Sequence, residues 1–264
     1  MVSDAYRILR GDDWAAGLRA CLPAATADMP GWMEHNTRLL KRDRYSAVGL
    51  LSVQGQLCCL KHYSAKSAWQ NMGFRFAISR GVRSFDAAAD LLQAGLKVPA
   101  PRACLWRPGA MFLLSQGVAD SSDLRALWLA GPAVDAAGRY LRTAGETLAA
   151  LHLAGFAHGD CKWSNLLWRR ETCYLVDLED AGRVRAPGGQ QPALHARQLR
   201  DIARFTADAE ALAVSPGQYQ NFLASYCLAI HCTPAQLRDQ VQQPLRLIRQ
   251  RHRRKSGISH PALL

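Results

Sequence analysis

The sequence predicts an α+β chain with two lobes, in which a small β-rich lobe with one main helix precedes a larger α-helical lobe. Two observations indicate this order. Residues 37–63 alternate apolar and polar side chains, which is typical of half-buried strands, whereas from residue 120 onward apolar side chains recur mostly at a helical spacing. We therefore expect a helical or irregular lead-in at residues 1–36, a β-rich lobe at 37–117, and a helical lobe at 118–264 that ends in a basic tail.

The first lobe is predicted to begin with two or three antiparallel strands around a turn at Gln54-Gly55, and the last of them, QLCCLKHY, contains Lys61. A helix is predicted over residues 82–96 because its apolar residues follow a period close to 3.6, and Gly95 is suited to its end. The segment VPAP then interrupts the chain. The apolar runs CLW and AMFLLS after it are predicted to be short strands.

The second lobe is predicted to contain a long helix over residues 136–156, which ends near glycines. Two short apolar runs, LLW and CYLVDL, follow and indicate a hairpin with its turn near Arg169. From about Arg197 the pattern is helical again, and we expect Pro234 and Pro244 to interrupt it.

The charge of the chain indicates an anionic partner. The formal net charge is +12, and about half of this excess lies after Val241, where there are six lysines and arginines and no acids. These cations are Arg246, Arg249, Arg251, Arg253, Arg254 and Lys255. A basic surface favours nucleic acid, anionic lipid headgroups or phosphorylated small molecules, and charge alone does not choose among them.

Other features of the sequence exclude several classes of protein. Hydrophobic residues make up 49% of the chain and charged residues 20%, which is ordinary for a globular protein. The eight cysteines form no C-x-x-C pair, so neither a zinc ribbon nor a thioredoxin-type site is indicated. The first residues lack the apolar core of a secretory signal, and no run approaches 18 apolar residues. We expect a cytosolic protein with reduced, mostly buried thiols.

The segment HGDCKWSN, residues 158–165, is the strongest candidate for chemistry. It follows the long helix and precedes the hairpin, whose second strand is predicted to end in Asp177, so Asp160, Asn165 and Asp177 are expected at the rim of one hairpin. Oxygen ligands of this kind suit a hard cation such as Mg²⁺. A carboxylate that is not bound to the metal orients a hydroxyl group or accepts its proton.

This pattern, H-x-D-x-x-x-x-N followed about a dozen residues later by an apolar strand and an aspartate, resembles the catalytic loop and metal-binding aspartate of the protein-kinase-like fold. Lys61 is similar to the phosphate-binding lysine of the small lobe, and Asp201 in RQLRDIARF is similar to the structural acid that follows the metal-binding loop. The sequence HGD is typical of the small-molecule branch. Within that branch KWSN, VPAP and RDIARF most resemble the bacterial lipopolysaccharide kinases of the Kdo/WaaP type and related InaA-like proteins.

The resemblance implies a role for each residue of the site. Asp160 would align the attacking sugar hydroxyl or accept its proton, and Lys162 would steady the transferring phosphoryl group. Asn165 and Asp177 would hold Mg²⁺ on the phosphates of ATP, and Lys61 would contact the α- and β-phosphates. His158 is expected to pack and hydrogen-bond within the loop. Cys161 is expected to pack there too, since no general base is predicted beside it.

Three departures from the family pattern are visible. The stretch KRDRYSAVG has one glycine where a glycine-rich loop is expected, so Arg42, Arg44 or Ser46 would have to assist in covering the phosphates. The acid that pairs with Lys61 is either Asp86 or Asp90 on the predicted helix, and we favour Asp86. Asp177 is followed by Leu-Glu rather than Phe-Gly, and the segment after it is short and lacks A-P-E, which argues against a regulated protein kinase.

The leading hypothesis is an ATP-dependent kinase that phosphorylates a heptose or Kdo sugar of the lipopolysaccharide inner core. Its substrate would be lipid-linked, and the basic tail would hold the enzyme at the anionic cytoplasmic face of the inner membrane. Two alternatives keep the fold: a soluble phosphotransferase of the aminoglycoside or choline type, whose cationic substrates the basic charge disfavours, and a catalytically inactive binding protein. Binding of nucleic acid is not expected, because the tail has no interleaved aromatic residues for base stacking.

Overall fold

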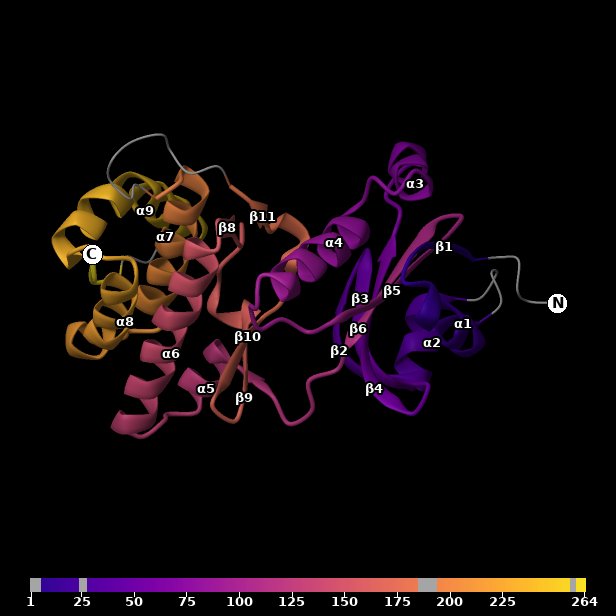
Figure 1. Cartoon of the computed structure of the whole chain (residues 1–264), viewed down its shortest axis with the longest axis horizontal. Helices are drawn as coiled ribbons and strands as arrows, with labels where there is room; N and C mark the ends of the chain where they lie inside the picture. The colour runs from indigo at the N-terminus through magenta and orange to yellow at the C-terminus, as the bar shows by residue number, and fades with distance from the viewer. Residues whose placement is uncertain (1–5, 24–27, 185–193, 257–259) are drawn as a thin grey trace. The chain divides into compact units, whose positions relative to one another are not determined.

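The structure, a computed structural model, describes residues 6–23, 28–184, 194–256 and 260–264. The chain divides into two compact units (Figure 1). The first unit comprises residues 1–93 and 98–120, and the second comprises residues 94–97 and 121–264. Each unit is described by itself.

The first unit is built on one antiparallel sheet of six strands in the order β1-β5-β6-β4-β3-β2. The strands are β1 (Arg7–Arg10), β2 (Arg38–Asp43), β3 (Ser46–Val53), β4 (Gln56–Ser64), β5 (Pro101–Arg107) and β6 (Ala110–Gln116). Its helices are α1 (Asp12–Cys21), α2 (Met29–Asn36), α3 (Ala68–Arg75) and α4 (Arg80–Gln93). The mixed composition, with a β-rich N-terminal part and a helical C-terminal part, confirms the predicted fold class.

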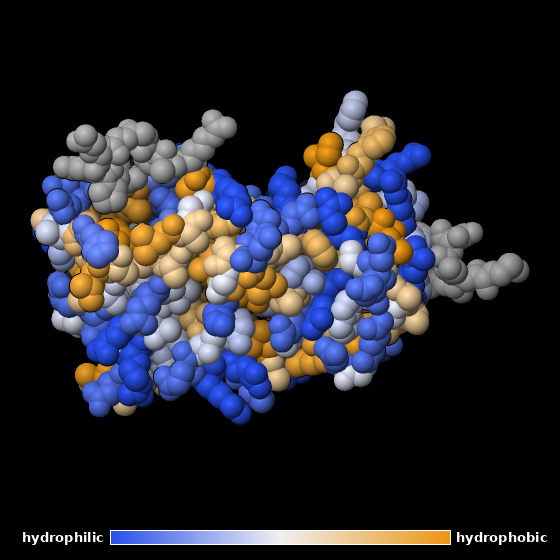
Figure 2. All heavy atoms as spheres, in the orientation of Figure 1, coloured by the Kyte–Doolittle hydropathy of each residue, from blue (hydrophilic) through white to orange (hydrophobic). Residues whose placement is uncertain are grey.

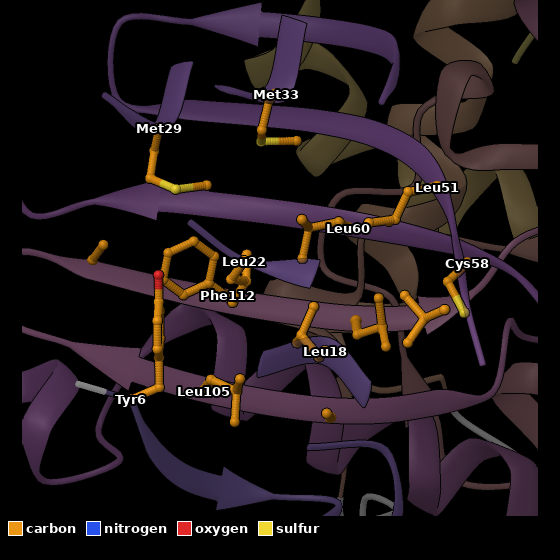
Figure 3. Packing of buried hydrophobic residues seen from close by; sticks show 14 of the residues in the cluster. Tyr6, Leu18, Leu22, Met29, Met33, Leu51, Cys58, Leu60, Leu105 and Phe112 are labelled. Atoms are coloured by element: carbon orange, nitrogen blue, oxygen red, sulfur yellow. The ribbon is translucent and has the colours of Figure 1, made fainter. Parts of the chain in front are cut away.

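The two faces of this sheet have separate cores, because side chains alternate between the faces along each strand. On one face, α1 and α2 cover a cluster that includes Leu18, Met33, Leu60 and Phe112 (Figure 3). On the other face, α3 and α4 contribute Phe74 and Val82 to a second cluster of buried residues. The other members of the second cluster are Tyr63, Cys104, Met111 and Leu113.

Most elements predicted for this unit are confirmed. The turn between β3 and β4 falls at Gln54 and Gly55, both with positive φ (51° and 73°), which is the geometry that suits a two-residue hairpin. The predicted helix over 82–96 corresponds to α4, and Gly95 follows its end with φ 81°. Strand β1 and helix α3 were not predicted, since the four residues of β1 are too few for a periodic signal and α3 is only two turns long.

The second unit is mainly helical, with two small sheets ordered β10-β9-β7 and β11-β8. Its helices are α5 (Leu124–Leu129), α6 (Val134–Leu153), α7 (Ala196–Ala211), α8 (Pro216–Ala229) and α9 (Pro234–Ser256), with short 3₁₀ turns η2 (Trp163–Asn165) and η3 (Leu178–Asp180). Its strands are β7 (Ser122–Asp123), β8 (Phe156–Ala157), β9 (Leu166–Arg169), β10 (Thr172–Leu175) and β11 (Gly182–Arg183). The predicted hairpin is β9–β10.

Helix α9 corrects one prediction. Pro234 begins this helix, but Pro244 lies inside it and does not interrupt it. Proline in a helix interior removes one backbone hydrogen bond. The helix continues because Leu237, Val241 and Leu245, spaced four residues apart, are all buried and hold its two halves on the same core.

The basic C-terminal segment is partly structural. Within α9, Arg249 donates to both carboxylate oxygens of Glu210 on α7, whose side chain is 2% exposed. The backbone N–H of Leu263 donates to the same carboxylate, and Arg249 also donates to the carbonyl of Leu264. One of the six predicted tail cations therefore neutralises a buried acid rather than facing a partner.

All eight cysteines are free thiols, five of them buried, which agrees with the predicted reduced state. Across the part of the chain that the structure describes, no helix combines the length and the apolar character needed to span a bilayer.

Candidate active site

The loop His158–Asn165 is fixed by a buried acid on helix α7. Asp201 is 1% exposed, and its carboxylate accepts the backbone N–H of His158 at 2.6 Å and that of Gly159 at 2.9 Å. The imidazole of His158 is buried and hydrogen-bonds through Nε2 to the carbonyl of Val176 at 3.0 Å. Charge-assisted bonds to buried backbone groups are among the stronger hydrogen bonds, so Asp201 holds the loop in one conformation.

Further contacts from the helices support this arrangement. His152 on α6 lies 3.4 Å from Asp201 and 2.7 Å from the hydroxyl of Tyr226 on α8. At the other end of the loop, the indole N–H of the buried Trp163 donates to the carbonyl of Phe205 and its backbone N–H donates to Asp208. The loop is therefore bound at both ends to rigid helices.

Gly159 is required by both its conformation and its surroundings. Its φ is +87°, and a Cβ at this position would lie 2.5 Å from the carbonyl oxygen of Asp180. No side chain fits at that distance, and L-residues rarely adopt such a φ. The glycine of HGD thus lets the loop pass directly against η3.

Asp160 is the loop's partly exposed carboxylate. Its side chain is 38% exposed, and Lys162 Nζ lies 2.8 Å from Oδ2. Arg204 on α7 lies 3.8 Å from the other oxygen, Oδ1. Cations therefore lie next to both oxygens of this carboxylate. An ionised carboxylate on a fixed loop is suited to orient a hydroxyl group or accept its proton.

Asn165 and Asp177 are neighbours across the base of the β9–β10 hairpin, since the backbone N–H of Val176 donates to the carbonyl of Asn165 at 3.0 Å. The side-chain Nδ2 of Asn165 donates to the carbonyl of Asp160 at 2.9 Å, which leaves Oδ1 as the atom of this amide that a cation can use. Asp177 does not lie in β10 as predicted. It has left-handed backbone angles, φ 63° and ψ 55°, and begins η3.

The donor set at this position fits Mg²⁺ on a polyphosphate. Mg²⁺ takes oxygen ligands and usually keeps waters and substrate phosphates, with only one or two protein ligands. One amide oxygen and one carboxylate match that pattern. Within residues 6–23, 28–184, 194–256 and 260–264, no three His, Cys, Asp or Glu side chains group around a point.

Cys161 has the properties of a packing residue, as predicted. It is fully buried, and burial, together with the negative charge of Asp201, raises the pKa of its thiol well above the ordinary value. A thiol of this kind is a poor nucleophile at neutral pH because the thiolate is the reactive form.

Lys61 lies in the middle of β4 in the first unit, where it pairs with Val48 on β3 and Leu113 on β6. Side chains two residues apart along a strand point to the same face of the sheet. The Lys61 side chain therefore lies on the same face as that of Tyr63, which is the face that α4 covers. Its ammonium group lies 5.2 Å from the ring centre of Tyr63.

The structure gives Asp86, the acid predicted to pair with Lys61, another partner. Both carboxylate oxygens of Asp86 are bound by Arg10 on β1, at 2.8 Å and 3.0 Å. Strand β1 is at the edge of the sheet, three positions from β4, a separation of roughly 14 Å at the usual strand spacing. Asp86 is therefore held near the edge of the sheet and away from the strand that carries Lys61.

The stretch without a glycine-rich loop forms a tight turn. Only Arg44 and Tyr45 connect β2 to β3, and the Arg44 guanidinium lies 5.1 Å from the Tyr45 ring centre. Arg42 forms an ion pair with Glu34. The single glycine of the stretch, Gly49, has a packing role, since a Cβ there would meet Thr37 Oγ1 at 2.1 Å.

Beside the loop, the second unit has an open pocket of about 260 Å³ lined by Gly159, Asp180, Arg197 and Arg200. Arg197 is turned toward it by donating to the carbonyl of Asp180. The pocket is lined by two guanidinium groups and one carboxylate, so its charge is positive overall and suits an anionic group.

Comparison with known proteins places this geometry in a family. The model of the lipopolysaccharide kinase (Kdo/WaaP) family matches residues 32–226, well over half of the chain. The chain belongs to the lipopolysaccharide kinase (Kdo/WaaP) family. Membership supports a phosphotransferase of the lipopolysaccharide kinase type, and it confirms the resemblance drawn from the sequence.

Two solved structures are similar to this Kdo/WaaP family member. One is WaaP in complex with acyl carrier protein, with 15% identity, a TM-score of 0.59 and coverage of 94% of this chain and 98% of that chain. The other is a Neurospora crassa PAN3 pseudokinase mutant, with 13% identity, a TM-score of 0.47 and coverage of 78% and 56%. At such identity the first structure shows a shared fold. No curated protein matches the sequence.

Sequence reasoning missed several residues of this candidate site, above all Arg204 and Asp208. Both lie on the helix that carries Asp201, at positions i+3 and i+7 from it, and so share its face. That spacing was visible in the sequence. The approach of Gly159 to Asp180 was not, because it depends on the path of the chain between β10 and β11.

Proposed function

We propose that this protein is an ATP-dependent kinase that transfers a phosphoryl group to a hydroxyl of a heptose or Kdo sugar in the lipopolysaccharide inner core. The observation that most supports this is the conformation of the loop His158–Asn165, in which Asn165 Nδ2 donates to the carbonyl of Asp160 and lies 3.5 Å from its carboxylate, while the backbone of Asn165 pairs with Val176, the residue before Asp177. Membership of the Kdo/WaaP family supports the same reaction class.

In this proposal the side chains position the reactants and neutralise charge. Asp160 aligns the acceptor hydroxyl and receives its proton as the new O–P bond forms, while ADP leaves with the electrons of the broken bond. Lys162 steadies the transferring group. Asn165 and Asp177 would hold Mg²⁺, which when bound offsets the charge of the phosphates. Lys61 is proposed to contact the α- and β-phosphates, a role that rests on the family resemblance.

The acid that positions Lys61 is proposed to be Asp90. It lies one turn after Asp86 on α4, and this helix covers the sheet face to which the Lys61 side chain belongs. Asp86 is bound by Arg10 and is no longer proposed for this role.

The pocket at Arg197 and Arg200 supports an anionic acceptor. Kdo carries a carboxylate, and inner-core sugars carry phosphates, so two guanidinium groups next to Gly159 suit such a substrate. The same cations disfavour an aminoglycoside or choline, which is positively charged. We therefore propose a lipopolysaccharide sugar as the acceptor. A soluble phosphotransferase of the aminoglycoside or choline type is the less favoured alternative.

A catalytically inactive binding protein is the other candidate, and one observation favours it. The β2–β3 connection is a two-residue turn, Arg44–Tyr45, with no glycine backbone to cover phosphates. Under the kinase proposal Arg44 supplies charge in place of backbone amides.

We propose that the enzyme works at the cytoplasmic face of the bacterial inner membrane, where a lipid-linked core oligosaccharide is presented. The exposed cations of α9 other than Arg249 would be attracted to anionic lipid. Because the similar WaaP structure contains acyl carrier protein, a carrier protein is a second proposed partner.

The test is phosphate analysis of the lipopolysaccharide core in cells whose only copy of the protein carries Asp160→Ala. We expect the loss of one phosphate substituent, and we expect Asp239→Ala, which removes an exposed acid of α9, to leave the core unchanged. A core with full phosphate in the Asp160→Ala strain would reject the proposed function.

A further inference from the structure

Helix α3 in the first unit and the turn that follows it, residues 76–78, expose an unusual set of large apolar side chains. Trp69 is 83% exposed, Met72 51%, Phe76 63% and Ile78 74%. Of the twelve large hydrophobic side chains that are exposed in the described parts of the chain, these four lie within ten residues, and they include the exposed tryptophan and phenylalanine. Figure 2 shows orange and pale spheres gathered over α3. We call these four side chains the α3 surface.

The exposure of the α3 surface follows from how the helix is anchored. Phe74 is 3% exposed and packs in the core with Val82 and Met111, and Asn71 accepts the backbone N–H of Gly109 at 2.8 Å. These residues fix the inner face of the helix to the β5–β6 hairpin. Trp69, Met72 and Phe76 are spaced i, i+3 and i+7, so they share the opposite face.

The segment that carries the α3 surface is rich in exposed cations. Between Ser64 and Phe85 the chain contains Lys66, Arg75, Arg80 and Arg83 and no acid, and all four cations are exposed. Arg7 on β1 adds a fifth, since its guanidinium donates to the carbonyl of Arg75 at 3.3 Å. Bulky apolar side chains, including a tryptophan, on a segment rich in lysine and arginine are typical of a helix that lies in an anionic membrane interface.

The positive charge around the α3 surface also disfavours binding of a second copy of the chain to it. A symmetric dimer would bring the α3 surface of one copy against that of another. The cations of each copy would then face each other without acids from the same segment to balance them.

We infer that the α3 surface docks on an anionic lipid bilayer, with Trp69, Met72, Phe76 and Ile78 entering the interface and the surrounding cations contacting headgroup phosphates. This surface is distinct from the cations of α9. The exposed arginines of α9 after Val241, at positions 246, 251, 253 and 254, belong to the second unit. Docking by α3 does not depend on the proposed function, because it requires no phosphoryl transfer.

The inference is tested by flotation of the full-length protein with vesicles of phosphatidylethanolamine and phosphatidylglycerol (3:1), and with vesicles of phosphatidylcholine alone. We expect the double variant Trp69→Ser/Phe76→Ser to lower the partition coefficient on the anionic vesicles by about tenfold. The matched control Leu153→Ser/Leu228→Ser removes two equally exposed apolar side chains of the second unit and should change it less than about twofold.

A charge variant and a light-scattering measurement complete the test. Lys66→Glu/Arg75→Glu should weaken binding to the anionic vesicles and leave binding to phosphatidylcholine unchanged. Equal binding of Trp69→Ser/Phe76→Ser and the wild type to anionic vesicles would overturn the inference. So would a wild-type dimer in light scattering that the same variant converts to a monomer, which would assign the α3 surface to self-association.

Discussion

Asp201 holds the loop His158–Asn165 through two backbone N–H groups, and its own carboxylate is almost fully buried. Replacing it by asparagine would turn one of the two acceptor oxygens into an N–H donor that faces another donor. We expect Asp201→Asn to lower the free energy of unfolding by about 2–4 kcal/mol and kcat by at least about a hundredfold.

The measurement is urea unfolding together with ATP turnover, with Asp239→Asn on the exposed face of α9 as the control. A variant at position 201 that kept the wild-type kcat would show that the loop does not depend on this anchor.

His62, also at the residue scale, makes the first unit sensitive to acid. Burial, with a smaller contribution from Arg107, lowers the pKa of His62 from 6.5 to about 4. As the pH falls from 6.5 toward 4, the unfolded chain binds a proton that the folded chain does not bind. The free energy of unfolding should therefore decrease over this interval, by roughly 3 kcal/mol in all.

His62→Leu should remove this part of the pH dependence, while His35→Gln at an exposed position should retain it. Urea unfolding of the three proteins between pH 7 and pH 4 makes the comparison. Parallel curves for wild type and His62→Leu would contradict the explanation.

At the scale of elements, the loop His158–Asn165 and η3 are in contact through Gly159. We expect Gly159→Ala to destabilise the protein more than Gly131→Ala, because both positions have positive φ (+87° and +70°) but only a Cβ at 159 meets another backbone. The strain of a positive φ alone costs an L-residue about 1–2 kcal/mol. The additional loss of unfolding free energy in Gly159→Ala, compared with Gly131→Ala, therefore measures the clash with Asp180.

The turnover number should also differ between the two glycine variants. Gly159→Ala should lose most of its kcat, since the loop must move away from η3, whereas Gly131→Ala should retain it. Equal effects of the two substitutions on stability and kcat would show that the approach to Asp180 is not tight in solution.

The first turns of α7 present Arg197 and Arg200 to the pocket beside the loop. If these cations bind an anionic group of the acceptor, Arg200→Ala should raise the KM for the acceptor by about tenfold and leave the KM for ATP unchanged. Steady-state kinetics with Arg238→Ala, an exposed arginine of α9, as the control tests this. A change in both KM values, or in neither, would contradict a role of this pocket in binding the acceptor.

At the scale of the whole molecule, the sequence predicted the elements with strong periodicity. The strands β2, β3 and β4 and the helices α4 and α6 have clear apolar patterns, and the spacing of Asp160, Asn165 and Asp177 led to the prediction of a site at this loop. Such features depend on residues that are close together in the sequence, so they can be read from the sequence alone.

The errors have a different origin, because they depend on tertiary contacts. The pairing of Asp86 depends on β1, a strand that its four residues did not reveal, and the continuity of α9 through Pro244 depends on the core beneath the helix. The left-handed conformation of Asp177 and the contact of Gly159 with Asp180 likewise follow from how the chain is folded around η3. Local propensity does not determine these features.

The most direct test of the account compares Asp160→Asn with Asp177→Asn in two assays: binding of Mg²⁺-ATP by calorimetry, and ATP-dependent phosphorylation of isolated core oligosaccharide. We predict that both variants lose phosphorylation by at least about a hundredfold, that Asp160→Asn binds Mg²⁺-ATP as the wild type does, and that Asp177→Asn loses Mg²⁺-dependent binding. Phosphorylation by Asp160→Asn at the wild-type rate, or unchanged Mg²⁺-dependent binding by Asp177→Asn, would contradict it.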